Sequence, residues 1–251
     1  MLTGVYSRKL ALLIAAVGVG ASTLGAAVAN ADMMQTFELS NYNAGDASNP
    51  LDATITFNFS AAAKDLTITI DNTTPSTYSA GELIRSVGFS LAGVTAPATL
   101  DNAAMVGEER TVANNGSLTD SAELANSQLT SPWTFNANSG TYTLSAAGSK
   151  DLVIGPANAN GQYSGDGSID GNHGHNPFVT SGASFTINLP GITPGSEVAG
   201  NNIVVGYGTS NLTASVPMTF TSSSAPEPAT LGMLAVGGVG LLLGRRKAKR
   251  L

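Results

Sequence analysis

The stretch that decides the fold is ATITFNF at residues 53–59, followed by DLTITID at residues 65–71. In each stretch apolar and polar side chains alternate, so that the apolar ones share one face of an extended strand. Only residues 60–64 separate the two stretches, which is a usual length for a hairpin connection. We therefore predict an antiparallel β-hairpin with one buried face.

Shorter alternating runs extend this pattern along the chain, at residues 86–91, 134–135, 141–144, 152–154, 184–189, 202–207 and 212–220. Residues 101–130 are less regular, and residues 120–124 could begin one short helix. Helical periodicity is otherwise scarce, and prolines lie at the ends of runs. These features predict an all-β domain over residues 32–221, an antiparallel β-sandwich with a jelly roll or barrel as the alternative.

Residues 1–31 have the layout of a secretory signal peptide. Arg8 and Lys9 precede an apolar run at residues 10–24, and Ala29 and Ala31 form an A-x-A cleavage site. We expect the general secretion machinery to export the chain. Signal peptidase then cleaves after Ala31 and leaves Asp32 as the first mature residue.

The C-terminal end combines three elements in a fixed order. Residues 222–225 are predicted to be a flexible linker, and the tripeptide Pro226-Glu227-Pro228 follows it, held extended by its prolines. Residues 229–244 carry no charge and would form a transmembrane helix of about 24 Å, shorter than the ~30 Å hydrocarbon core. The basic block, which includes Arg245, Arg246 and Lys247, should stay in the cytoplasm. An ordinary membrane anchor is the alternative reading.

This tail resembles the PEP-CTERM sorting signal of Gram-negative bacteria. The matching residues are Pro226 to Gly232, the apolar run and Arg245-Arg246-Lys247. The resemblance implies that an exosortase, a membrane protease-transpeptidase, removes the tail at residues 226–251. The product would be released or attached to the cell surface or extracellular matrix.

Part of the domain is loosely similar to the bodies of many PEP-CTERM surface proteins. The similar motifs are GDGSID at residues 165–170, NPF at 176–178, FTINL at 185–189 and VVGYGT at 204–209. This resemblance implies a secreted β-rich domain and assigns it no activity.

The charge balance excludes one class of partner. The precursor has a net charge of −6. Both ends are rich in cations, so residues 32–226 keep only 4 basic residues against 16 acidic ones, a net charge of −12. Such an acidic surface argues against nucleic acid. The chain has no cysteine, so a thiol nucleophile and disulfides are also excluded.

A half-matched calcium loop is the best local candidate for a ligand site. Asp166, Ser168 and Asp170 offer oxygen atoms at positions 1, 3 and 5, and Gly171 stands at position 6. Position 12 is Pro177 rather than a glutamate, so a plain turn between strands is the competing reading. The nearby His173 and His175 offer too few ligands for a metal of their own.

The remaining candidates do not predict an enzyme. Glu108-Glu109 looks like a charged pair in a loop, and no Gly-x-Ser-x-Gly elbow or phosphate-binding loop is present. Six aromatic residues could stack on sugars, namely Tyr42, Tyr78, Trp133, Tyr142, Tyr163 and Tyr207. We expect a non-catalytic, exosortase-processed domain. A polysaccharide-binding module, with or without calcium, is the alternative, and a hydrolase of matrix polymers ranks last.

Overall fold

A computed structural model of the chain describes residues 32–43, 50–94, 97–138, 140–163, 169–171, 174–200, 203–209 and 214–224. All of them belong to one compact unit, residues 30–227. The predicted signal peptide at residues 1–31 and the predicted transmembrane helix at residues 229–244 lie outside these ranges. Within them, no helix has the length and apolar character needed to cross a membrane.

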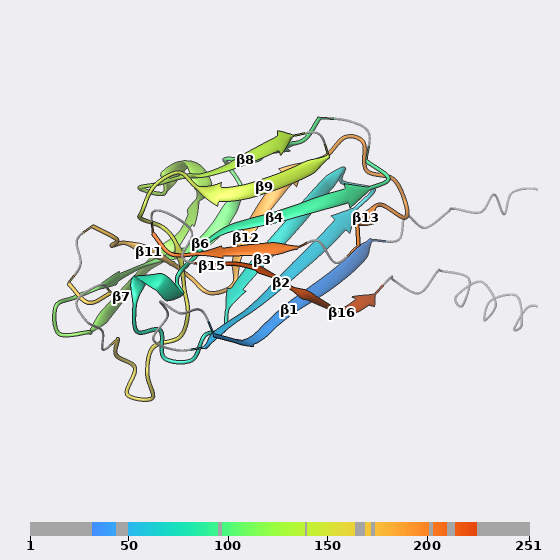
Figure 1. Cartoon of the computed structure of the whole chain (residues 1–251). Coiled ribbons are helices and arrows are strands. Elements are labelled where there is room, and N and C mark those ends of the chain that lie inside the picture. The colour runs from blue at the N-terminus through green and yellow to red at the C-terminus, as the bar shows by residue number, and fades with distance from the viewer. Residues whose placement is uncertain are drawn as a thin grey trace, which may run out of the picture. The chain divides into compact units, whose positions relative to one another are not determined.

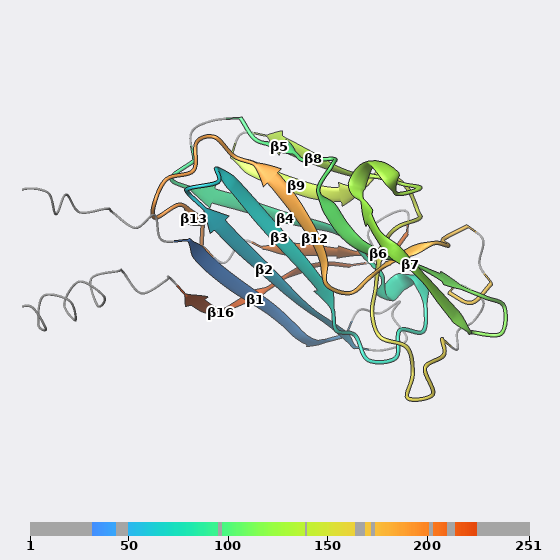
Figure 2. The ribbon, with the colours of Figure 1, turned by 180° about the vertical axis from the view of Figure 1, so that it is seen from behind.

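The unit is all-β and consists of two sheets (Figure 1). The six-stranded sheet has the order β16 (Thr219–Ser224), β1 (Met33–Tyr42), β2 (Leu51–Ser60), β3 (Asp65–Asn72), β12 (Ala183–Asn188) and β5 (Thr99–Leu100). Figure 2 shows this sheet from its outer side, with β1 and β16 next to each other. The chain thus places its first and last described strands side by side.

The second sheet has ten strands. Its main path is β15 (Ala214–Pro217), β14 (Val204–Tyr207), β4 (Ile84–Ala92), β10 (Val153–Ile154), β11 (Phe178–Thr180), β6 (Met105–Val112) and β7 (Leu118–Ala125). Off this path, β9 (Thr141–Ala146) joins β4 to β8 (Trp133–Asn138), and β13 (Glu197–Val198) also pairs with β4. The described residues add two single-turn 3-10 helices, η1 (Ala80–Glu82) and η2 (Asn126–Gln128).

The predicted hairpin is confirmed as β2 and β3, which pair antiparallel. Ile55 lies opposite Ile70, and Phe57 lies opposite Ile68. All four side chains are buried, because the period-2 pattern directs them to the same face. Burying each such side chain stabilises the fold by about 1.5–3 kcal/mol.

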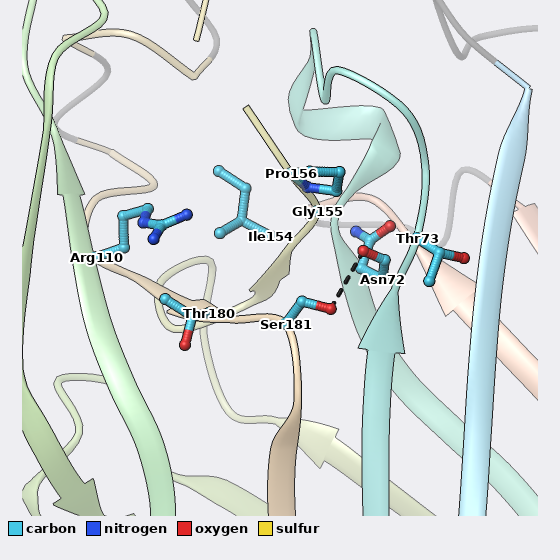
Figure 3. A pocket seen from close by; sticks show the side chains of 8 residues that line it. All are labelled: Asn72, Thr73, Arg110, Ile154, Gly155, Pro156, Thr180 and Ser181. Atoms are coloured by element: carbon cyan, nitrogen blue, oxygen red, sulfur yellow. Dashed lines mark hydrogen bonds between the residues drawn. The ribbon is translucent and has the colours of Figure 1, made fainter. Parts of the chain in front are cut away.

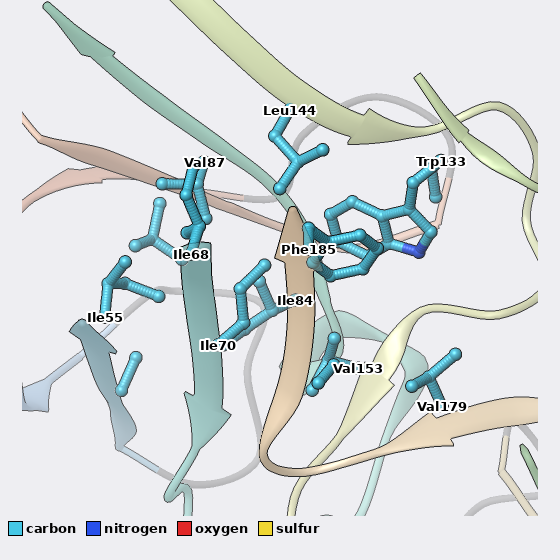
Figure 4. Packing of buried hydrophobic residues seen from close by; sticks show 14 of the residues in the cluster. Ile55, Ile68, Ile70, Ile84, Val87, Trp133, Leu144, Val153, Val179 and Phe185 are labelled. Carbon is cyan, nitrogen blue, oxygen red and sulfur yellow. The ribbon is translucent and has the colours of Figure 1, made fainter. Parts of the chain in front are cut away.

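The two sheets pack face to face around one apolar core, as Figure 4 shows for Ile68, Val87 and their neighbours. Aromatic rings contact each other across the gap between the sheets. Phe57 of β2 lies 5.0 Å from Phe89 of β4, and Trp133 of β8 lies 4.7 Å from Phe185 of β12, measured between ring centroids. The fold is therefore sandwich-like, as the alternating runs predicted. One pair, β10 with β11, is parallel rather than antiparallel.

The least regular part of the sequence forms a second hairpin. Strands β6 and β7 pair antiparallel, so the short helix suggested for residues 120–124 is wrong. Glu108 and Glu109 lie in β6 and not in a loop. Most of β7 is exposed, so its sequence carries no buried apolar face. Backbone pairing holds the two strands together, and an ion pair between Arg110 and Asp120, with 2.6 Å between Nη2 and Oδ2, adds a side-chain contact between them.

The predicted linker begins inside the fold. Residues 222–224 are the end of β16, where they pair with β1, instead of a flexible spacer. Backbone hydrogen bonds hold an edge strand even where the sequence offers nothing bulky to pack. The sheet therefore extends three residues beyond the predicted end of the domain at residue 221.

Candidate functional sites

Most of the residues predicted for a site lie outside the described ranges. This holds for the sorting tripeptide, the signal-peptide cleavage residues, the basic block and two of the calcium residues, that is, for Pro226, Glu227, Pro228, Ala29, Ala31, Arg245, Arg246, Lys247, Asp166 and Ser168. Asp170 is the member of the predicted calcium loop that the structure describes. The functions predicted for the others stay predictions.

Asp170 is half-buried, and its Oδ1 atom is buried without a hydrogen-bond partner. The next residue, Gly171, has a φ of +60° and fits tightly against Asn114, since an added Cβ would lie 2.0 Å from Asn114 Oδ1. A glycine is therefore required at this turn. Among the described residues no group of three or more His, Cys, Asp or Glu could hold a metal ion. The Nδ1 atom of His175 lies 3.3 Å from the carbonyl oxygen of Ser149.

Four of the six aromatic residues proposed to stack on sugars belong to the core. Trp133, Tyr142, Tyr163 and Tyr207 are buried, whereas Tyr42 and Tyr78 are each 39% exposed. Rings inside the core cannot offer a face to a polysaccharide. The described part of the chain therefore does not carry these six residues as an exposed row on one sheet face.

Sequence reasoning missed a pair of neighbouring carboxylates, Asp151 and Glu109. Asp151 follows β9, has a φ of +56° and is fully buried. Three backbone contacts fix it: its N–H donates to Pro177 O (2.8 Å), its carbonyl accepts from Trp133 Nε1 (2.8 Å), and its Oδ2 accepts from the N–H of Ser131.

The side chain of Asp151 faces Glu109. Asp151 Oδ1 and Glu109 Oε1 are both buried, and neither has a hydrogen-bond donor. Burial and, after it, the adjacent Glu109 raise the pKa of Asp151 to about 7. A carboxyl group that holds its proton near neutral pH can donate that proton to its neighbour. Long-range packing creates this pair, and no local motif in the sequence signals it.

This pair is poorly placed for catalysis on a polymer. Asp151 has no exposed surface, so a glycan or peptide cannot reach its carboxyl group. A hydrolase would need two carboxyl groups that flank the bond to be cut. We therefore assign the pair a role in stability.

One cavity, of about 430 Å³, lies at the ends of β3, β10 and β11 (Figure 3). Its lining combines hydroxyl groups with one cation and is made by Asn72, Thr73, Arg110, Ile154, Gly155, Pro156, Thr180 and Ser181. Ser181 Oγ donates to the carbonyl oxygen of Asn72, another lining residue, over 3.3 Å (Figure 3). No lining residue is a carboxylate, histidine or cysteine, so this cavity offers no general base.

The cation of this cavity is already neutralised. Arg110 Nε and Nη2 donate to the two carboxylate oxygens of Asp120 (2.6 Å each), and Nη1 donates to the hydroxyl of Tyr163 (3.0 Å). This bidentate pairing lowers the pKa of Asp120 and raises the pKa of Arg110. An anionic ligand would have to displace Asp120, so the cavity suits a neutral polar group.

A second cavity, of about 670 Å³, opens between β5, at the edge of the first sheet, and β8 of the second. Its lining mixes apolar and polar side chains, among them Leu100, Asn102, Pro132, Thr134 and Phe135. Phe135 is half-buried, and its ring stacks on Tyr142 with centroids 5.7 Å apart. The cavity carries no charged side chain.

Strand β16 connects the sandwich to the C-terminal tail. Ser224 lies opposite Met34, and Glu38 lies opposite Thr219, with a register shift between Thr36 and Phe37. The other edge of β16 has no strand partner among the described residues. The domain therefore begins and ends at the same end of one sheet (Figures 1 and 2).

Comparison with known protein families identifies the segment that follows. Residues 224–247 match the PEP-CTERM protein-sorting motif. This match confirms the resemblance seen in the sequence, and a motif of this kind implies an exported protein of Gram-negative type that is sorted through an exosortase. No curated protein and no solved structure matches the chain.

Proposed function

We propose that this protein is exported, is processed by an exosortase at its C-terminal tail, and is delivered to the cell surface or extracellular matrix. Its sandwich-like domain then serves there as a non-catalytic structural module. The sorting motif at residues 224–247 supports the processing step.

One observation carries the proposal. Strand β1 begins at Met33, one residue after the predicted first mature residue Asp32, and β16 ends at Ser224, two residues before Pro226. The folded domain thus fills the interval between the two predicted cleavage regions. Both cuts would leave a complete sandwich.

The tail explains why processing follows export. Residues 229–244 are short for a membrane helix, and five cations follow them within residues 245–250, which favours a cytoplasmic C-terminus. In that orientation the tripeptide at residues 226–228 lies at the outer face of the inner membrane, within reach of a membrane peptidase. The anchored state is a transient stage in this proposal.

The test compares the protein from an exosortase-positive host with that from the same host lacking the exosortase. We expect a mass that starts at Asp32 and lacks the tail in the first host, and a membrane-bound form with the intact tail in the second. The same mass in both hosts would contradict the proposal. An N-terminus that begins before Asp32 would contradict the predicted signal-peptide cleavage.

A second candidate function is binding of a polysaccharide, favoured by the uncharged cavity between β5 and β8. Phe135 offers an aromatic side chain there, and Asn102 and Thr134 offer hydrogen-bonding groups, a combination that suits sugar rings. Calorimetric titration with the exopolysaccharide of the host tests it. Binding that Phe135→Ala weakens would support this function, and no heat of binding would remove it.

A further inference from the structure

The end of β16 overlaps the start of the sorting motif. The sorting motif begins at Ser224, which is also the last residue of β16 and the register partner of Met34. Only Ala225 lies between Ser224 and Pro226, and one residue spans at most about 3.6 Å. The folded sheet therefore reaches to within one residue of the sorting tripeptide.

Because β16 ends so close to the tripeptide, its pairing with β1 conflicts with proteolysis at the tripeptide. An enzyme that recognises an extended peptide forms hydrogen bonds with the backbone of several consecutive residues. If the cut lies at or near the tripeptide, residues 222–225 have to enter the enzyme. In the folded protein, β1 occupies one edge of residues 222–224, so the same backbone cannot be enclosed by the enzyme.

The composition of β16 suits a release of its end. Phe220 anchors the first half of β16, because its ring centroid lies 5.3 Å from that of Phe37. After Phe220 the strand contains only Thr221 and three serines. The register shift between Thr36 and Phe37 separates the two halves of the pairing. Freeing residues 222–224 therefore breaks backbone hydrogen bonds to β1 but removes no large side chain from the core.

We propose that residues 222–224 form a releasable end of β16, which pairs with β1 in the folded precursor and leaves β1 to bind the exosortase. This inference rests on the proposed function. It assigns to the enzyme a binding segment that lies partly inside the folded domain. The anchor at Phe220 limits how far the strand opens, so the sandwich stays folded during cleavage.

Engineered disulfides test the release, because the chain has no cysteine of its own. Met34→Cys with Ser224→Cys locks the end of β16 to β1, since opposite residues have Cα atoms about 4.5–5.5 Å apart, which a disulfide can bridge. Glu38→Cys with Thr219→Cys is the matched control, because its disulfide cross-links the start of β16 to β1 and leaves residues 222–224 free.

Both full-length pairs are expressed in an exosortase-positive host and in the same host lacking its periplasmic disulfide oxidase. Intact mass reports both the disulfide and the tail. We expect the oxidised Met34–Ser224 pair to keep the tail and its reduced form to lose it. The oxidised Glu38–Thr219 pair should lose the tail as the wild type does.

Two results would overturn the inference. One is removal of the tail from the oxidised Met34–Ser224 pair at the wild-type rate. The other is retention of the tail by both oxidised pairs, which would assign the block to cross-linking of the sheet in general. A wild-type protein that keeps its tail would instead contradict the proposed function, so the two failures are distinguishable.

Discussion

Met34 in β1 lies directly opposite Ser224 in β16. The first strand after the predicted export signal and the last strand before the sorting motif are therefore hydrogen-bonded neighbours. Antiparallel pairing places the start of β1 and the end of β16 at one end of the sheet. The first and last described strands of the domain therefore begin and end at the same end of this sheet.

The carboxylate pair predicts how stability changes with pH. The pKa of Asp151 in the folded protein, about 7, lies above the ordinary value of 3.8, so the folded state holds a proton that the unfolded state releases. The stabilisation is fully present below pH 4 and is lost as the pH rises through about 7. Thermal unfolding from pH 4 to pH 9 should show this loss in the wild type.

Asp151→Asn removes the titrating group and retains an acceptor for the N–H of Ser131. We expect the variant to be more stable than the wild type at pH 8, by about 1–3 kcal/mol, because a neutral amide that can donate a hydrogen bond to Glu109 replaces the buried carboxylate of Asp151. Glu38→Gln, at an exposed position of β1, serves as the control and should keep the wild-type profile. A variant with an unchanged profile would refute this role of Asp151.

We predict that the side chain of Trp133 contributes strongly to the free energy of unfolding. Its ring packs against Phe185, and its Nε1 donates to the carbonyl of Asp151. Trp133→Ala should lower the free energy of unfolding by about 3–5 kcal/mol. Trp133→Phe leaves one carbonyl unpaired and should cost about 1–3 kcal/mol.

Denaturant unfolding followed by circular dichroism measures both Trp133 variants, since each removes the only tryptophan. Met105→Ala, at a side chain that is 48% exposed, is the control and should change stability by less than about 0.5 kcal/mol. A cost for Trp133→Ala as small as that of the control would show that the core does not depend on this ring.

The sequence predicted the fold wherever burial falls on one face of a strand. The hairpin of β2 and β3 is the clearest case, because its apolar residues keep a strict period of two. Strands β6 and β7 escaped prediction because polar residues such as Glu123 occupy exposed positions along β7. Backbone pairing joins these strands, and the ion pair of Arg110 with Asp120 adds a contact between them that no local pattern encodes.

The sites also differ in whether the local sequence could reveal them. The sorting motif was predictable because its order of prolines, apolar run and cations is local. The environment of Asp151 was not, since Pro177, Trp133 and Glu109 approach it only in the folded chain. The serines at the end of β16 suggest a linker, yet backbone pairing with β1 places them in the sheet.

The calcium hypothesis has its own test on the processed protein. If the loop binds calcium, millimolar Ca²⁺ should raise the Tm relative to excess chelator, by mass action. Asp170→Ala should abolish that rise, because it removes the oxygen that has no hydrogen-bond partner in the described structure. Glu197→Gln, at an exposed position of β13, should keep it. Equal Tm values with calcium and chelator would eliminate the hypothesis.

The anchor of β16 should control the rate of processing. Phe220→Ala removes a ring contact with Phe37 that is worth about 0.5–1.5 kcal/mol, so the open form of the strand end becomes more populated. We expect the tail to be removed several times faster in pulse-chase labelling, with Met105→Ala as the unaffected control. Slower or unchanged processing of Phe220→Ala would contradict the role of the anchor.

The most direct test of the central claim is the intact mass of the membrane and extracellular forms of Pro226→Ala/Pro228→Ala. Alanine favours helix where proline opposes it, so the segment preceding residue 229 should become helical and inaccessible to the peptidase. In an exosortase-positive host, we predict that the wild type loses its tail while the double variant stays in the inner membrane with residues 226–251 intact. Retention of the intact tail by the wild type as well would show that the segment is a plain anchor and would contradict the account.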